Sequence, residues 1–150
     1  MNKFGAVSAI LALTLIGGLT SRWSVVANHS VSHSQGLLRR CNRVVERCQS
    51  MPVTGDTNLD VGALRVVQTC MLLSVLLLGV TLADMYFDPK DRHLQAMMLS
   101  AAAGFNLAAC GIYMLRLNKI GGTKGRLGMS WWCCILAGVL AAILTHRHLK

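Results

Sequence analysis

Two cysteines with six residues between them lie in a short basic stretch, HSQGLLRRCNRVVERC, at positions 33–48. Such a pair of thiols can form a disulfide, carry a redox reaction or bind a metal. Cys41 and Cys48 could form a zinc site together with His29 and His33, although their spacing is wider than zinc-binding pairs usually show. The residue types alone leave all three chemistries open, so the surroundings of the pair have to be considered.

The elements that must position this pair are apolar. The sequence is 53% hydrophobic and 14% charged, whereas a water-soluble domain has about 25% charged residues. Four runs contain no Asp, Glu, Lys or Arg, at residues 4–21, 66–83, 94–115 and 127–145. A helix of roughly 20 apolar residues crosses a bilayer, and these runs lack the polar stripe of a soluble helix. We therefore predict four membrane spans.

The first run has a second interpretation. A basic residue, Lys3, followed by the apolar residues 4–16 is also the pattern of a cleaved signal peptide. Apolar or small residues continue to Thr20 without a clear cleavage site. This continuation favours a membrane span.

The connections between the runs define the rest of the fold. With four spans, the long connection at residues 22–65 and the third connection at residues 116–126 lie on one side, and both termini lie on the other. The long connection lacks helical periodicity and is rich in β-branched and small residues, which indicates short strands and turns. Asp60 can cap the second helix, which we expect to begin near Leu64. The predicted fold is an all-α membrane four-helix bundle that carries a small antiparallel β-sheet.

The side of the membrane on which the sheet lies is indicated by three signals. Asn28-His29-Ser30 is an N-glycosylation sequon, and Cys41 and Cys48, the only cysteines outside the runs, need an oxidising compartment to pair. Both signals place the sheet outside the cell. The charges oppose them, because the terminal side holds five Lys and Arg residues and the sheet side ten, the reverse of the positive-inside rule. We predict cytoplasmic termini, a plasma-membrane location and a glycan on Asn28.

The long connection contains a pattern typical of a known family. Trp23, Gly36-Leu37-Leu38, Cys41 and Cys48 resemble the W…GLW-x-x-C…C signature of the claudin, peripheral myelin protein and epithelial membrane protein superfamily. The resemblance continues in order through Arg65 at the start of the second span, Gly111-Ile112-Tyr113, and the SWWCCILAG segment of the fourth span. One position departs from the signature, since Leu38 replaces its second tryptophan.

The resemblance implies a claudin-like fold and a disulfide between Cys41 and Cys48. Such a bond would contribute roughly 2.5 kcal/mol by the loop-entropy estimate, which is substantial for a small sheet. The family works in cell–cell contact, junctions and membrane organisation, so the implied partners are this chain itself or related four-span proteins, in cis and in trans. The alternative is an auxiliary subunit of a channel or receptor, as the related calcium-channel gamma proteins are.

An enzyme is the third possibility. Four-span thiol oxidoreductases such as vitamin K epoxide reductase also combine a cysteine pair in a loop with cysteines in the last helix. Here Cys133 and Cys134 would have to be that inner pair, but adjacent residues on a helix point about 100° apart, which is a poor geometry for a dithiol. The sequence has no nucleophile–base pair, phosphate-binding glycine loop or carboxylate couple. We therefore expect a non-enzymatic protein without cofactor or metal, in which Cys70, Cys110, Cys133 and Cys134 are buried apolar residues.

The arginines near the cysteine pair suggest an interaction surface. Arg39, Arg40, Arg43 and Arg47 are predicted to form a basic extracellular patch, which would attract acidic partners, lipid head groups or small anions. Nucleic acid is not an expected partner on that side. The alternative is a solvated face that protects an edge strand from aggregation.

The third run contains small residues at helical spacing. Ser100, Gly104 and Ala108 recur every fourth residue, and such stripes allow close helix packing in lipid. We expect the stripe to pack inside the bundle, with contact between copies as the alternative. Asn106 should face the bundle, because an unpaired amide is costly in hydrocarbon. Asp84 lies at the edge of the second run, and no second intramembrane acid is present to form a proton relay with it.

Overall fold

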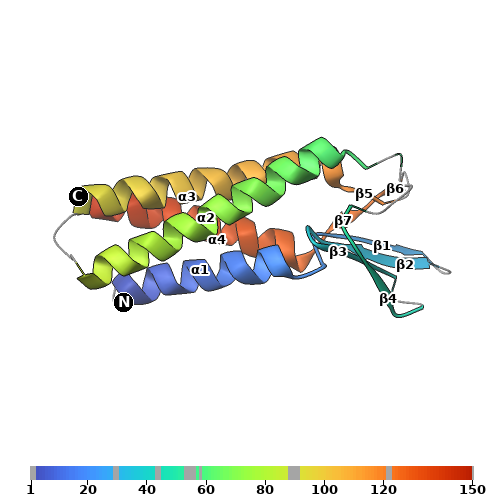
Figure 1. The fold of residues 1–150 in the computed structure, drawn as a ribbon, viewed down its shortest axis with the longest axis horizontal. Helices are drawn as coiled ribbons and strands as arrows, with labels where there is room; N and C mark the ends of the chain where they lie inside the picture. Colours follow the sequence, from blue (N-terminus) through green and yellow to red (C-terminus); the bar gives the residue numbers. More distant parts are fainter. Residues whose placement is uncertain are drawn as a thin grey trace.

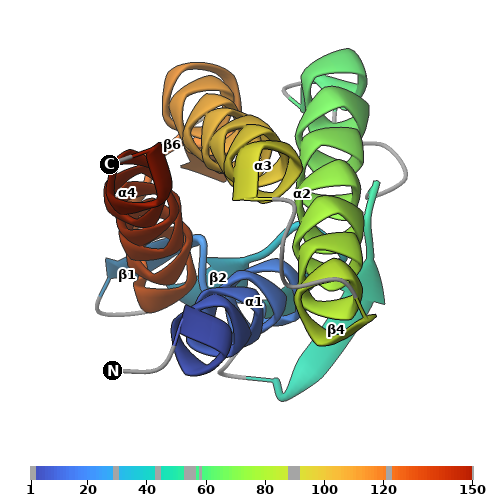
Figure 2. The ribbon, with the colours of Figure 1, turned by 90° about the vertical axis from the view of Figure 1, so that its left-hand side faces the viewer.

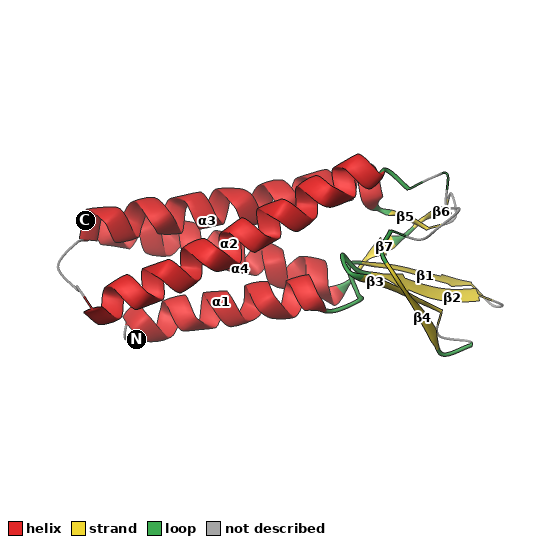
Figure 3. Cartoon of the chain, viewed as in Figure 1, coloured by secondary structure: helices red, strands yellow, loops and turns green. Residues whose placement is uncertain are grey.

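Four helices lie side by side and a small sheet stands at one end of the bundle (Figures 1 and 3). The computed structural model describes residues 3–28, 31–42, 45–52, 57, 59–87, 92–120 and 123–149. The helices are α1 (Lys3–Leu19), α2 (Val61–Phe87), α3 (Arg92–Ile112) and α4 (Met129–Leu149). A π-helical segment, Tyr113–Leu117, continues α3 toward the sheet.

Three of the helical segments are long and apolar enough to cross a membrane, namely Val61–Phe87, Arg92–Leu117 and Met129–Arg147. The first helix, α1, is apolar but has 17 residues. Large apolar side chains also cover the outside of the bundle, as Leu72, Leu76 and Val80 do on α2. Helices that are apolar on the inside and on the outside are typical of a membrane protein.

Asp60 caps the N-terminus of α2. The carboxylate of Asp60 accepts a hydrogen bond from the backbone N–H of Ala63 at 2.9 Å, so the predicted cap is confirmed. The helix begins at Val61, a few residues before the expected start near Leu64, because the cap satisfies donors of the first turn itself.

The helices form a ring in which each packs against two neighbours (Figure 2). Viewed along the bundle, α1 and α3 lie diagonally opposite, and α2 and α4 lie between them. The interior contains one apolar cluster near the sheet, around Trp23 and Tyr113, and a second one toward the other end, around Leu78 and Leu99. The start of α1 and the end of α4 both lie at the end away from the sheet (Figure 1).

The sheet has five antiparallel strands in the order β4-β3-β2-β1-β7. The long connection supplies β1 (Ser24–Asn28), β2 (Val31–Gln35), β3 (Arg39–Asn42) and β4 (Arg47–Ser50). The third connection supplies β7 (Arg126–Leu127), preceded by a ladder of β5 (Lys119–Ile120) and β6 (Thr123–Lys124). We expected strands in the long connection only, so the pairing of Ser24 with Leu127 is a link that the sequence analysis missed.

Candidate functional site

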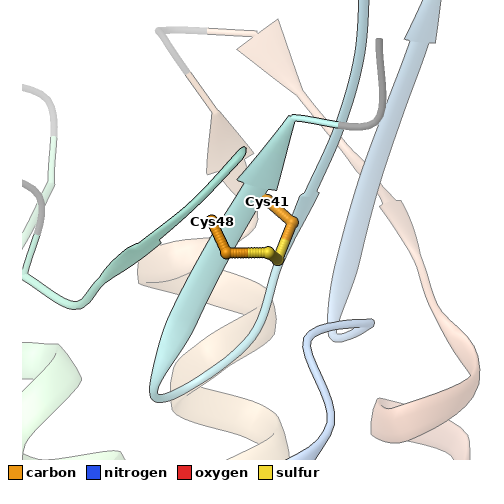
Figure 4. The surroundings of a disulfide bond; sticks show 2 residues. All are labelled: Cys41 and Cys48. Atoms are coloured by element: carbon orange, nitrogen blue, oxygen red, sulfur yellow. A yellow bond between two sulfur atoms is a disulfide. The ribbon is translucent and has the colours of Figure 1, made fainter. Parts of the chain in front are cut away.

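The disulfide joins β3 to the edge strand β4 (Figure 4). Cys41 on β3 lies directly opposite Cys48 on β4, with a Cα–Cα distance of 4.1 Å and a bond between the two sulfur atoms. Opposite residues in an antiparallel pair point to the same face. The predicted disulfide between Cys41 and Cys48 is therefore confirmed.

The alternation of side chains along the strands gives the sheet two different faces. On β3 and β4, Arg39, Cys41 and Cys48 share one face, which we call the disulfide face. Arg40 and Arg47 point to the opposite face.

The predicted basic patch is therefore not one surface. Arg39 and Arg40 are adjacent on β3 and lie on opposite faces of the sheet. On the opposite face, Arg40 and Arg47 line a shallow cavity together with His33. Arg43 lies outside the described residues. The expectation of a single outward patch is wrong, because strand geometry separates neighbouring side chains.

Trp23 anchors the sheet on the bundle. Its side chain is fully buried and its indole N–H donates to the carbonyl of Gly17 at the end of α1. Its ring lies 4.7 Å from the ring of Tyr113, at an interplanar angle of 55°. Its backbone N–H donates to Gln35, and its carbonyl accepts from Gly128. A single residue thus contacts α1, the end of α3, the sheet and the start of α4.

Gln35 is the second buried contact between the sheet and the bundle. Its amide nitrogen donates to the carbonyl of Leu117 at 3.1 Å, and its side-chain oxygen accepts from Nε of Arg40 at 3.0 Å. The hydroxyl of Tyr113 donates to the backbone carbonyl of Gln35 at 3.4 Å. Nothing in the local sequence marks Gln35, because its bundle partners lie about 80 residues further along the chain.

Two further signature positions owe their residue type to close packing. A Cβ on Gly36 would lie 2.6 Å from both Ser21 Cα and Thr20 O, so only glycine fits without moving the backbone. Leu37 is fully buried and its carbonyl accepts from the side chain of Gln68. Leu38, where the signature has its second tryptophan, is 46% exposed and lines an apolar groove between α1 and α2. Arg65 is exposed on α2.

A cavity of about 610 Å³ lies beneath the disulfide face, between the end of α1 and the start of α4. Arg22, Arg39 and the two disulfide cysteines line it, together with the exposed apolar residues Ile16, Leu19 and Met129. Cys133 also lines this cavity. The sequence does not predict this cavity, because its lining residues come from three distant segments.

Cys133 and Cys134 do not face each other, and the thiol of Cys134 instead contacts that of Cys110. Cys133 is half-buried and lines the cavity, whereas Cys134 is buried with its sulfur facing Gly17 of α1. Their side chains diverge, as expected for neighbours on a helix. Cys110 is buried and Cys70 is half-buried, so the expectation of four buried cysteines holds fully for Cys110 and Cys134 only.

The zinc interpretation conflicts with the sheet. Cys41 and Cys48 are bonded to each other, and His33 points to the opposite face. His29 lies outside the described residues. Within the described part of the chain, no cluster of His, Cys, Asp or Glu is placed to hold a metal ion.

The polar residue in the middle of α3 faces inward, as predicted. Asn106 is buried and its amide nitrogen donates to the hydroxyl of Thr14 on α1 at 3.2 Å. The hydroxyl of Thr14 donates in turn to the carbonyl of Ile10. At the other end of the bundle, Asp84 is half-buried and accepts from Gln95 at 3.0 Å.

The small-residue stripe faces outward. Ser100, Gly104 and Ala108 are all exposed, and a Cβ on Gly104 would have no neighbour within 4 Å. The expectation that the stripe packs inside this bundle is therefore wrong. Ala102, Ala103 and Ala109 line the interior in its place, because they lie on the same side of the helix as Asn106. Contact between copies through the stripe stays a prediction.

The predicted glycosylation site lies at the end of the hairpin between β1 and β2. Asn28 is the last residue of β1 and pairs with Val31, while His29 and Ser30 lie outside the described residues. The glycan on Asn28 stays a prediction.

No protein-family model and no curated protein sequence matches the chain.

Proposed function

We propose that this chain is a non-enzymatic four-span membrane protein of claudin-like type, whose disulfide-stapled sheet lies outside the cell and acts in cell–cell contact or membrane organisation. The resemblance of Trp23, Gly36-Leu37 and the cysteine pair to the family signature supports this proposal. So do the structural roles of these residues, because Trp23, Gly36 and Leu37 join the sheet to the bundle and the cysteine pair joins β3 to β4. The partners would be membrane lipids and other copies or relatives of the chain.

The proposal makes α1 the fourth span. Val7, Ile10 and Gly17 are buried against the other helices, while Ile16 and Leu19 are exposed on the outside. A helix of 17 residues extends over about 26 Å at roughly 1.5 Å per residue, close to the hydrocarbon thickness of about 30 Å. An apolar helix that is packed along the bundle and exposes large apolar side chains fits a membrane span better than a soluble segment.

The observation that carries the proposal is that the sheet is held on the helical bundle while its edge strand β4 is unpaired in the described structure. In the described sheet, β4 is an edge strand and all four of its residues are exposed. Trp23, Gln35 and the disulfide hold the strands behind it. An exposed edge offers unpaired backbone groups to a strand of another molecule. A rigid edge of this kind suits lateral or trans association.

The test is enrichment at cell contacts. The short Cα–Cα distance of 4.1 Å marks Cys41 and Cys48 as a non-hydrogen-bonded pair, so alternate residues of β4, including Ser50, direct their backbone N–H toward the free edge. Ser50→Pro removes this donor, and Ser50→Ala keeps it. In cells without junctions, wild type and Ser50→Ala should accumulate where two expressing cells meet. Ser50→Pro should reach the surface in equal amount but remain evenly distributed over it. Uniform wild-type protein at normal surface levels would contradict the proposal.

A second candidate function is that of an auxiliary subunit of a channel or receptor. It is favoured by the outward stripe of Ser100, Gly104 and Ala108, because small residues let a helix of another membrane protein approach closely. Purification in mild detergent should then recover a channel in fixed stoichiometry, and Gly104→Leu should abolish the association. Gly79→Leu on α2 is the matched control, since a Cβ on Gly79 would also have no neighbour within 4 Å. Recovery of homomers alone would favour contact function.

A further inference from the structure

The cavity beneath the disulfide face lies where the bundle meets the sheet. It has a volume of about 610 Å³ and is bounded by the last turn of α1 and the first turn of α4. Of its lining residues, Ile16, Leu19 and Met129 are each more than half exposed, at 52%, 66% and 71%. The cavity is thus continuous with an apolar outer surface of the bundle.

Two arginines also line the cavity. Arg22 follows α1 and Arg39 begins β3, and both side chains are exposed. Within the described residues, neither guanidinium forms an ion pair or a hydrogen bond. No carboxylate lines the cavity in the described part of the chain. The two positive charges are therefore available to a ligand.

The hydroxyl groups of Thr20 and Ser130, which line the cavity, are already used as donors. The backbone N–H of Arg22 donates to Ser130 Oγ at 3.2 Å, and the hydroxyl of Thr20 donates to the carbonyl of Ile16 at 2.7 Å. The contact between the two hydroxyls must then use the proton of Ser130. Since both protons are engaged, the side-chain donors that remain for a ligand are the two arginines and the hydroxyl of Ser21, beside the positive end of the α4 dipole.

We propose that this cavity binds the phosphodiester headgroup of a membrane phospholipid, with Arg22 and Arg39 on the phosphate and the acyl chains along Ile16, Leu19 and Met129. Guanidinium groups bind phosphate oxygens in bidentate fashion. A polar headgroup site directly above an apolar surface matches the two halves of one lipid molecule. Because the site holds two positive charges without a counter-charge, lipids with net negative charge should bind more tightly than zwitterionic ones. The inference needs the bundle to lie in a bilayer but does not depend on a role in cell contacts.

The test uses the full chain purified in a mild non-ionic detergent. Phosphatidylglycerol or phosphatidylcholine is titrated into the micelles, and bound lipid is counted by native mass spectrometry while the midpoint of thermal unfolding is followed. We expect one phosphatidylglycerol to bind with preference over phosphatidylcholine and to raise the midpoint. The double variant Arg22→Gln/Arg39→Gln should bind phosphatidylglycerol about tenfold or more weakly, because it loses charge-assisted hydrogen bonds.

The control removes the same charge from the same end of the molecule. Arg47→Gln/Arg126→Gln changes two exposed arginines outside this cavity and should bind as wild type does, within about twofold. Equal losses in both double variants would overturn the site, since binding would then follow net charge alone. Stabilisation by inorganic phosphate or glycerol 3-phosphate equal to that by phosphatidylglycerol would overturn the lipid assignment. The single variants Arg22→Gln and Arg39→Gln repeat the test if the double variant unfolds.

Discussion

Arg40 and Gln35 are joined across neighbouring strands, with Nε of Arg40 donating to the side-chain oxygen of Gln35 at 3.0 Å. The amide nitrogen of Gln35 donates onward to the carbonyl of Leu117 at the end of the π-helical segment. Gln35 is fully buried, so its amide obtains hydrogen bonds only from the protein. This contact links two strands of the sheet to the end of the helical bundle.

The first prediction follows from this contact. Gln35→Leu should lower the free energy of unfolding by about 1–3 kcal/mol, because it leaves the carbonyl of Leu117 and the Arg40 guanidinium without their buried partner. Gln49→Leu, at an exposed position on the same face of the sheet, should change it by less than about 0.5 kcal/mol. Unfolding in detergent, followed by thermal or denaturant titration, measures both variants. Equal stabilities would mean that the Gln35 contact does not hold the sheet.

The second prediction concerns the disulfide. Cys41→Ala/Cys48→Ala should destabilise the protein by about 2–3 kcal/mol and cause its retention in the secretory pathway. Cys133→Ala, which leaves the disulfide intact, should reach the cell surface normally. Alkylation mapping of the non-reduced protein should find Cys41 and Cys48 blocked and Cys133 reactive. If Cys133 proved as necessary as the disulfide, a redox role would replace the structural one.

The third prediction separates two neighbouring arginines. Arg40→Glu places a carboxylate against the side-chain oxygen of the buried Gln35, so surface delivery should fall. Arg39→Glu changes an exposed side chain on the other face and should leave delivery unchanged. Surface biotinylation of the two variants makes this comparison. Similar delivery of both would show that the Arg40–Gln35 contact is not needed for folding.

The fourth prediction concerns close packing at Gly36. Gly36→Ala should destabilise the protein by about 1–3 kcal/mol, because the new Cβ would meet backbone atoms of Thr20 and Ser21 that cannot move independently. Gly104→Ala, on the open outer side of α3, should be neutral or stabilising by up to about 1 kcal/mol. Thermal unfolding of both in the same detergent distinguishes a packing requirement at Gly36 from a general loss of glycine.

The helices were predictable because their causes are local. Long charge-free runs indicate the helices, Asp60 marks the start of α2, and the position of Asn106 within a run predicts that it faces inward. The pairing of Cys41 with Cys48 came from the family pattern. A membrane-facing outside and an inward amide are both properties of a single helix, so no long-range information was needed.

The features that were missed depend on contacts between distant segments. The pairing of β7 with β1 and the bonds of Gln35 join residues about 80 to 100 positions apart. Two errors could have been avoided from local geometry. Adjacent residues on a strand point to opposite faces, which separates Arg39 from Arg40. Residues two apart on a helix do not share a face, so the inward Asn106 already placed Gly104 and Ala108 on the outside.

The side of the membrane on which the sheet lies tests the central claim most directly, since a contact protein must present its sheet to the outside. An epitope tag after Lys150 and glycosidase treatment, with Asn28→Gln as control, can be measured on the same cells. We predict that the antibody binds only after permeabilisation, and that glycosidase increases the mobility of wild type but not of Asn28→Gln. A tag accessible on intact cells together with a protein free of glycan would contradict the account, and would place the sheet in the cytoplasm as the excess of basic residues at that end suggests.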